Sequence, residues 1–356
     1  MGTSDKATRR DFLKVASATG ASLAFPAIWT GRANAAEQLT VSDYGGATSP
    51  ALRAGFYDPF EKQTGVRIIS VAHESDPVTQ FKLGVDSGSF IWDACLMTPD
   101  HVARLTAGKN YLAPLDVAPG DDRNILPGML TKNWFGFSVY AVLMAYRTDK
   151  FPKGGPNSWQ DFWDTNRFPG NRGLYRAPIG LFENALLADG VPLKNLYPID
   201  VERAFRSLDK IRSHVTVWWA NGAQNTQLLQ NGEVDMADTW NARALAAIKG
   251  GAPVKMVWEG TYNADGWALP IGSPKLKLAQ QFVRFCLDAK RQAVYSAMVS
   301  NGPSNSDAYK YIDRQQAVLL PTYPANLERL ARRDTDWWGK NFDPVTARFQ
   351  EWLLKS

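Results

Sequence analysis

The feature that most restricts the fold is a regular alternation of short apolar segments with amphipathic segments of helical spacing. Residues 39–42, 66–71 and 93–97 are predicted short strands, and Leu52, Phe56 and Phe60 between the first two recur every four positions, as in a helix. Gly65 ends the first helical segment, as glycine commonly does at a helix C-terminus. Strands that alternate with helices in this way are typical of βαβ units with a parallel sheet. This part of the chain is therefore expected to form an α/β domain.

A second series of strands and helices follows a long apolar segment at residues 137–146. This segment is nearly unbroken and ends at a loop, which favours a strand long enough to leave one domain and enter another. Residues 234–239 and 254–258 are predicted strands, and residues 241–249 form a predicted helix closed by two glycines. The chain is therefore expected to form two α/β lobes, with crossings at the long segment and near "DGWALP".

The limits of the two lobes follow from these crossings. We expect a first segment of lobe 1 at residues 36–138, lobe 2 at residues 139–265 and a return to lobe 1 at residues 266–305. Residues 306–356 are expected to add C-terminal helices to lobe 2, with "DTDWWGKNF" as a loop that interrupts them. Ligands of such folds bind where the carboxyl ends of strands converge, so a ligand cleft is expected between the lobes.

The first 35 residues have the composition of an export signal. Arg9 and Arg10 precede an apolar stretch, and Ala33-Asn34-Ala35 fits the A-x-A cleavage pattern. The arginine pair and the Asp, Phe, Leu and Lys that follow it resemble a twin-arginine signal, whose cargo crosses the membrane in folded form. An amphipathic first helix of the mature fold is the alternative. The apolar stretch is shorter than the roughly 20 residues that span a bilayer, so we expect a soluble periplasmic protein that begins near Ala36.

Composition and charge exclude several functional classes. The formal net charge is +5, but five basic and two acidic residues fall within the first 35, so the rest of the chain is nearly neutral. Without a basic run that could follow a phosphate backbone, nucleic-acid binding is not expected. The three histidines are widely separated and lack the spacing of a zinc site. Cys95 and Cys286 lie in apolar runs that favour buried free thiols, although an exported location would also permit a disulfide.

The motifs of common catalytic and cofactor sites are missing. The sequence contains no nucleophile elbow, phosphate-binding loop, zinc-protease helix or Gly-rich dinucleotide fingerprint. Abundant Asp and Glu residues leave a secreted enzyme with a glycosidase-like carboxylate pair as an alternative. In the absence of a positive motif, we expect a protein that is not an enzyme and that has no cofactor.

Several polar and aromatic residues fall at or near predicted strand ends, where a ligand site would lie. They are Tyr44, Thr98, Tyr175-Arg176, Trp240 and Asp265. Asp265 belongs to the segment "TYNADGWALPIGSPK", in which Tyr262 and Trp267 supply aromatic rings. A carboxylate in such a segment either binds a cation or forms a turn with the following Gly266.

The other residues at strand ends also have structural interpretations. Thr98 could cap the helix that follows it, and Trp240 could belong to a core. Arg176 could be a solvated edge residue, and Tyr44 could pack over the glycine turn that follows it. The sequence leaves both interpretations open at each position.

The order of several segments resembles one family of transport proteins. The chain contains, in this order, "YDPFEKQTGVRI", "WDACLMTPDHVARL", "GEVDMADTWNARALAAIKGGAPVKMVW" and "ADGWALPIGSPKLKLAQQFVRFCLD". Together they resemble the spermidine/putrescine-type solute-binding proteins of bacterial ABC importers over essentially all of the mature chain. The resemblance implies a type II clamshell of two α/β lobes that are joined by hinge strands and close on a ligand. It also implies a monomer without catalytic activity that delivers a small amine to an ABC permease in the inner membrane.

The resemblance also implies roles for individual residues. The acid that binds an amine in this family matches Asp265, a stacking tryptophan matches Trp240, and a hydroxyl residue of lobe 1 matches Thr98. Aromatic faces nearby, such as that of Tyr262, would add cation–π attraction of roughly 0.5–2 kcal/mol each. Asp265 is thus expected to pair with an ammonium group of the ligand.

The sequence departs from the polyamine-binding pattern in lobe 2. Polyamine binders place a second pair of acids there, whereas this chain has Ala177 and Gly180, with Arg176 beside them. A second ammonium group would meet a guanidinium at this place, and a carboxylate would be bound by it. An ω-amino acid such as 4-aminobutyrate is therefore an alternative to putrescine or spermidine. A metal-binding transport protein is a further alternative, disfavoured because Tyr309 and Tyr311 are not an adjacent iron-binding pair.

Overall fold

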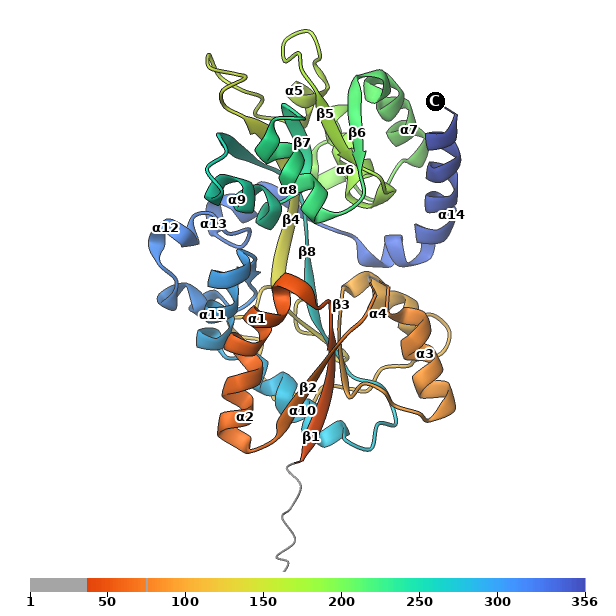
Figure 1. Cartoon of the computed structure of the whole chain (residues 1–356). Helices are drawn as coiled ribbons and strands as arrows, with labels where there is room; N and C mark the ends of the chain where they lie inside the picture. Colours follow the sequence, from red (N-terminus) through yellow and green to blue (C-terminus); the bar gives the residue numbers. More distant parts are fainter. Residues whose placement is uncertain (1–36, 75, 356) are drawn as a thin grey trace, which may run out of the picture. The chain divides into compact units, whose positions relative to one another are not determined.

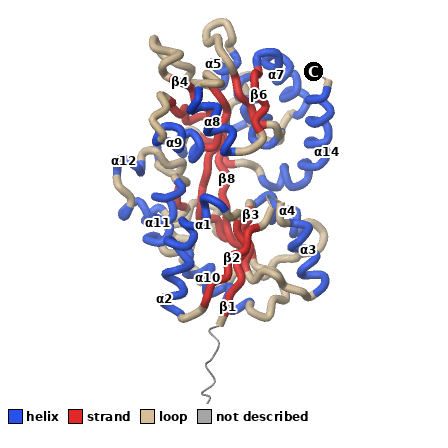
Figure 2. The backbone as a smooth tube through the Cα atoms, in the orientation of Figure 1, coloured by secondary structure: helices blue, strands red, loops and turns tan. Residues whose placement is uncertain are grey.

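The computed structural model describes residues 37–74 and 76–355 (Figures 1 and 2). Its strands are β1 (Gln38–Asp43), β2 (Arg67–Ala72), β3 (Ala94–Met97), β4 (Trp134–Arg147), β5 (Arg172–Tyr175), β6 (Val215–Trp219), β7 (Met236–Trp240), β8 (Val254–Ala268), β9 (Gly302–Pro303) and β10 (Leu330–Arg332). The predicted export signal, with Arg9, Arg10 and the cleavage motif, lies outside the described residues. None of the helices in the described ranges is long and apolar enough to cross a membrane.

The helices lie between these strands and at the C-terminal end. They are α1 (Ser49–Leu52), α2 (Asp58–Thr64), α3 (Val78–Ser87), α4 (Pro99–Thr106), α5 (Trp159–Trp163), α6 (Pro178–Ala188), α7 (Val201–Ile211), α8 (Gly222–Asn231), α9 (Asn241–Lys249), α10 (Leu276–Cys286), α11 (Ala289–Val299), α12 (Arg314–Ala317), α13 (Pro324–Leu327) and α14 (Thr335–Leu354). Gly65 follows α2 in the left-handed conformation, with φ 74°, and ends that helix as predicted.

The ten strands of the described residues form one mixed sheet that extends through both lobes. Its order is β2-β1-β3-β8-β4-β7-β5-β6, with β9 and β10 paired to β4 and β8. β1 is parallel to β2 and β3, and β5 is parallel to β6 and β7. The third strand of each set lies antiparallel to a long strand, β3 to β8 and β7 to β4. The two halves of the sheet therefore repeat one arrangement, and the predicted α/β class is confirmed.

The two long strands, β4 and β8, are shared by the cores of both halves (Figure 1). Trp134 and Phe137 of β4 pack in one core with Trp267 of β8, whereas Met144 of β4 and Val257 of β8 pack in another. The strands pair with each other along most of their length. Each lobe is thus built around one end of the same strand pair, which is the arrangement expected of hinge strands.

β8 is longer than the sequence suggested. Residues 254–258 and the segment around Asp265 form a single strand of 15 residues. Asp265 pairs with Ser138 of β4, and Gly266 pairs with Met97 of β3 as well as with Gly136 of β4. The alternative in which Asp265 and Gly266 form a turn is therefore wrong, because strands on both sides hold this segment extended.

The predicted loop at "DTDWWGKNF" is also wrong, since these residues begin the helix α14. Asp334 caps the helix by accepting a hydrogen bond from the Trp337 N–H at 2.8 Å. Trp338 is buried in a core of lobe 2. Gly339 lies inside this helix and allows it to pack closely against α4, because a Cβ at this position would lie 2.7 Å from the Ala103 Cβ.

Cys95 and Cys286 are both buried and free, so the expectation of buried thiols is confirmed. Burial raises the pKa of the Cys286 thiol well above its usual value, and a neighbouring hydrogen bond opposes this only in part. A buried thiol that stays protonated is unreactive, and the role of this cysteine is to pack in the first core.

The close approach of β8 to β4 at Gly266 gives a test of the fold. A Cβ at this position would lie 2.2 Å from the Phe135 carbonyl oxygen, and the backbone has no room to move away. We expect Gly266→Ala to lower the free energy of unfolding by about 2–4 kcal/mol, measured by urea denaturation. The matched control is Gly84→Ala in α3, where the nearest atom lies at 3.4 Å and stability should stay equal or rise by up to about 1 kcal/mol. Parent-like stability of Gly266→Ala would contradict the β4–β8 register.

Candidate ligand-binding site

Asp265 lies where the β3–β8 ladder ends, next to two other predicted site residues. Met97 pairs with Gly266 in the antiparallel ladder, so the following Thr98 lies beside Asp265. Tyr44, directly after β1, reaches the same point, and its hydroxyl donates a hydrogen bond to Asp265 Oδ1 at 3.2 Å. The structure thus brings together three residues from distant parts of the chain.

The Asp265 carboxylate is half-buried and has no ion-pair partner among the described residues. Burial raises its pKa to about 7, although the hydrogen bond from Tyr44 acts in the opposite direction. The buried Asp43 is different, because its oxygens accept hydrogen bonds from four donors: Gly45 N–H and the hydroxyls of Ser49, Tyr57 and Ser70. Asp265 therefore presents a charge that no described protein group compensates, as a site for a cationic ligand would.

Thr98 also has the structural role that its position predicts. It is the N-cap of α4, and its backbone N–H donates to His101 Nδ1 at 3.3 Å. The Thr98 residue is half-buried at the end of β3. A capping role and a place in the site are compatible, since the same strand end supplies both.

The polar face of the hinge strands continues from Asp265 to residues that the sequence analysis missed. Ser138 and Tyr140 of β4 pair with Asp265 and Asn263 of β8, so these four side chains lie on one face of the sheet. The signal is present in the sequence, because polar residues alternate with apolar ones in "FSVYAV" and "YNADGW". The apolar length of the first segment concealed this alternation.

Tyr262 lies on the opposite face of β8 from Asp265, because an odd number of steps separates them in a regular part of the strand. Its ring packs against cores of both lobes. Its carbonyl oxygen accepts the Arg333 N–H at 3.0 Å. The structure therefore places Tyr262 in the packing of the hinge and does not bring it beside the Asp265 carboxylate.

Arg333, in the connection between β10 and α14, places a buried guanidinium beside the polar face. Its Nη1 lies 3.5 Å from the Tyr140 hydroxyl and 3.9 Å from Asp100 Oδ2. Asn263 donates to the same Asp100 oxygen at 2.8 Å. Burial opposes its charge, but Tyr140 and Asp100 raise the pKa of Arg333 above its usual value. The site thus has an anionic group at Asp265 and a cationic group at Arg333.

The predicted residues of lobe 2 form a second group at the ends of β5 and β7. The half-buried Trp240 has its ring centroid 5.5 Å from that of Tyr175 and 5.3 Å from that of Trp219. Arg176 is exposed, and its guanidinium has no ion-pair partner in the part of the chain that the structure describes. Its backbone N–H donates to the Trp219 carbonyl at 2.9 Å. This group offers an aromatic surface and an unpaired cation.

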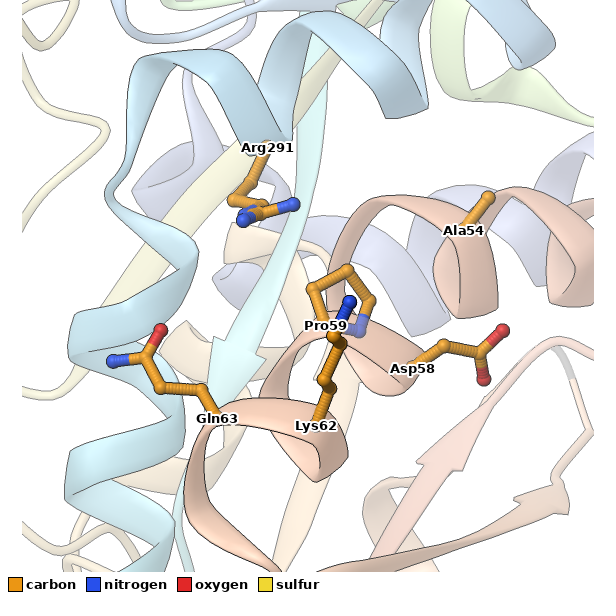
Figure 3. A pocket seen from close by; sticks show the side chains of 6 residues that line it. All are labelled: Ala54, Asp58, Pro59, Lys62, Gln63 and Arg291. Carbon is orange, nitrogen blue, oxygen red and sulfur yellow. The ribbon is translucent and has the colours of Figure 1, made fainter.

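Two surface depressions among the described residues lie away from both groups. One, of about 620 Å³, is lined by Ala54, Asp58, Pro59, Lys62, Gln63 and Arg291 (Figure 3). Another, of about 290 Å³, lies between the end of α6 and the loop that carries Arg329. No group of three or more His, Cys, Asp or Glu side chains within residues 37–74 and 76–355 could hold a metal ion. The unbalanced charges, rather than the hollows of the surface, mark the candidate site.

Similarity to known proteins identifies the family. The pattern described as bacterial extracellular solute-binding protein matches residues 55–322, most of the chain. The chain belongs to this family. This solute-binding protein is 33% identical to the gamma-aminobutyric acid-binding protein of Pseudomonas aeruginosa over 326 residues, which cover 90% of this chain and 92% of that protein. It is 22% identical to the spermidine/putrescine-binding periplasmic protein of Escherichia coli over 312 residues, which cover 85% and 87%.

A solved structure agrees with this assignment. The Atu4243-GABA receptor matches with a TM-score of 0.81 at 30% identity, over 89% of this chain and 97% of that chain. The fold is the two-lobed type II clamshell with hinge strands that the resemblance predicted. The family consists of binding proteins of transport systems and not of enzymes.

The uncompensated Asp265 carboxylate leads to a prediction for stability. Its pKa is about 7 in the folded protein, above the ordinary 3.8, so the free energy of unfolding falls as the pH rises from about 4 to about 7. Asp265→Asn removes this penalty. We expect the unliganded variant to be more stable than the parent protein by about 1–3 kcal/mol at pH 8, and by less at about pH 5. Urea denaturation at both pH values measures the difference.

The matched control is Asp43→Asn. This buried aspartate has its hydrogen bonds filled, so its replacement should lower stability at both pH values. If Asp265→Asn destabilises the protein as Asp43→Asn does, Asp265 is a structural residue and its assignment to the site is contradicted.

Proposed function

We propose that this solute-binding protein captures a small amine that also carries a carboxylate, such as the ω-amino acid 4-aminobutyrate. It does so in the periplasm, as a monomer, and delivers the ligand unchanged to the permease of an ABC importer. The observation that carries the proposal is the half-buried Asp265 carboxylate, which has no basic partner among the described residues. An ammonium group of the ligand would supply the missing charge.

The surroundings of Asp265 support an ammonium group at this position. Tyr44 already donates to one carboxylate oxygen, and Thr98 adds a hydroxyl that can accept a hydrogen bond from the ligand. Closure of a clamshell brings the strand ends of the second lobe toward those of the first. Trp240 would then add an aromatic face to the ammonium end of the ligand.

The other end of the ligand decides between an ω-amino acid and a polyamine. Arg176 is exposed and unpaired among the described residues, so it is free to bind a carboxylate. The nearest acid in that segment is the buried Glu183, which already accepts hydrogen bonds from Gly180 N–H, the Tyr197 hydroxyl and Trp338 Nε1. Glu183 therefore does not replace the acidic pair that would hold a second amine.

The relatives support the same choice. The relative named for gamma-aminobutyric acid, which is 4-aminobutyrate, is 33% identical to this chain, and the relative named for spermidine and putrescine is 22% identical. Both names refer to amines, which supports an acidic residue in the site. The higher identity supports a ligand that also has a carboxylate.

Calorimetry with 4-aminobutyrate and putrescine tests the proposal. Asp265→Asn keeps the shape of the side chain and removes its charge, so we expect a loss of about 2–5 kcal/mol in binding, or at least thirtyfold in affinity. Arg176→Gln should weaken 4-aminobutyrate to a similar degree, because the carboxylate loses its cation. The same change should leave putrescine unaffected or improve its binding, because a repulsive cation is removed.

Two variants serve as controls for these measurements. Asp122→Asn and Arg206→Gln change exposed residues of the same types away from the site, and both should bind like the parent protein. Parent-like binding by Asp265→Asn would refute the site. Tighter binding of putrescine than of 4-aminobutyrate would favour the polyamine instead.

The proposed route to the periplasm is the twin-arginine pathway. Replacing Arg9 and Arg10 by Lys should leave the precursor in the cytoplasm, because this pathway reads the arginine pair. Immunoblots of periplasmic and cytoplasmic fractions measure the outcome. Normal export of the double variant would contradict this route and favour a general secretion signal.

A further inference from the structure

Two buried arginines are used in different ways. Arg172 is fully buried, and its guanidinium donates to three carbonyl oxygens, those of Phe162, Phe168 and Gly170. Arg333 is 5% exposed, yet its guanidinium makes one hydrogen bond, to the Tyr140 hydroxyl at 3.5 Å, and a loose ion pair with Asp100 at 3.9 Å. Its Nε has no partner among the described residues. A buried guanidinium normally has its donors filled, so Arg333 lacks an acceptor.

The Tyr140 hydroxyl has a hydrogen left to donate. Because Arg333 donates to the phenol oxygen, the phenol hydrogen must find another acceptor, and the described residues provide none. Burial raises the pKa of Tyr140 above its usual value, so the phenol keeps its proton. Tyr140 is half-buried and lies diagonally across the β4–β8 ladder from Asp265. Diagonal neighbours in such ladders lie about 7–8 Å apart.

Asp100 does not complete the coordination of Arg333. Its Oδ2 also accepts the Asn263 side-chain amide at 2.8 Å, and its Oδ1 has no partner among the described residues. The pair is therefore incompletely hydrogen-bonded on both sides, which is costly for buried charges. Asp100 can keep the guanidinium in place, but it leaves donors available for a second anion.

We propose that Arg333 and Tyr140 bind the carboxylate of the ligand whose ammonium group pairs with Asp265, and that Asp100 is the counter-ion of Arg333 in the unliganded protein. The inference rests on the proposed function and adds Arg333 and Tyr140 to Arg176 as groups that bind the same carboxylate of the ligand. Anionic and cationic groups then lie on one face of the β4–β8 pair. Such a face selects short zwitterions and rejects amines without a carboxylate, because these would leave Arg333 unsatisfied.

Binding of 4-aminobutyrate and of butylamine, which lacks the carboxylate, tests this inference by calorimetry at pH 8. Arg333→Gln should weaken 4-aminobutyrate by about thirtyfold or more and leave butylamine unchanged or bound more tightly. Arg333→Lys keeps the charge and should restore part of the loss. Tyr140→Phe should weaken 4-aminobutyrate alone, by about fivefold to tenfold. Asp100→Asn removes a competing anion and should strengthen 4-aminobutyrate relative to butylamine.

The structural arginine supplies the control. Arg172→Gln should lower the melting temperature and leave the ratio of the two affinities unchanged. Equal losses of both ligands with Arg333→Gln would show a structural role and overturn the inference. The inference would also fail if only Arg176→Gln changed the ratio of the two affinities, and that outcome would leave the proposed function intact. A parent protein that binds butylamine as tightly as 4-aminobutyrate would refute both. If Arg333→Gln does not fold, Arg333→Lys and Tyr140→Phe decide by the same ratio.

Discussion

The antiparallel pairing of β4 with β8 is the constraint on which the rest of the structure depends. Both strands pass through both lobes, so their register fixes how the two cores are joined and which side chains share a face with Asp265. Ser138 lies opposite Asp265, and Tyr140 lies opposite Asn263. A slip of one residue would turn these polar groups to the other face of the sheet. The near contact of Gly266 with the backbone of β4 opposes such a slip, because only glycine fits there.

Two charged groups at or beside this strand pair, Asp265 and Arg333, support the proposed ligand site because their satisfaction differs from that of other buried charges. Asp43 and Arg172 show how the fold treats buried charges of purely structural use, since donors or acceptors surround each of them. Asp265 and Arg333 are only partly satisfied, although neither is openly exposed. Unsatisfied groups of this kind are usually removed from a core unless function retains them. Asp238 is also buried, with an Oδ2 that has no partner among the described residues and a pKa that burial raises to about 7, so incomplete satisfaction alone does not mark a ligand site. The proposed site rests on the place of Asp265 and Arg333 beside the same face of the strand pair.

The sequence predicted much of this architecture because its signals are local. Strand and helix periodicity placed Tyr44 and Thr98 at strand ends, and the parallel strands β1 and β3 bring these ends to the same edge of the sheet. Asp265 was also expected near a strand end, but it lies inside β8 and reaches this edge because β8 pairs antiparallel with β3. Arg333 escaped prediction because it reaches the site through a long-range contact between the C-terminal segment and β8. The face occupied by Tyr262 depends on strand register, which composition does not reveal. The helix at "DTDWWGKNF" escaped prediction, and its close contact at Gly339 with Ala103 joins segments far apart in the sequence, which leaves no local signal.

The repeated strand order of the two lobes has a consequence for how specificity can change. Tyr44 and Arg176 follow the first strand of their respective lobes, and Thr98 and Trp240 precede the helices that follow the third strands. Equivalent positions of the two lobes are therefore filled by chemically unlike residues. In the proposed site each lobe would supply half of the contacts to the ligand, so substitutions at the strand ends of one lobe would leave the contacts of the other unchanged. A protein built in this way can acquire a new ligand by changing the residues that bind one end of the ligand while it retains those that bind the other end.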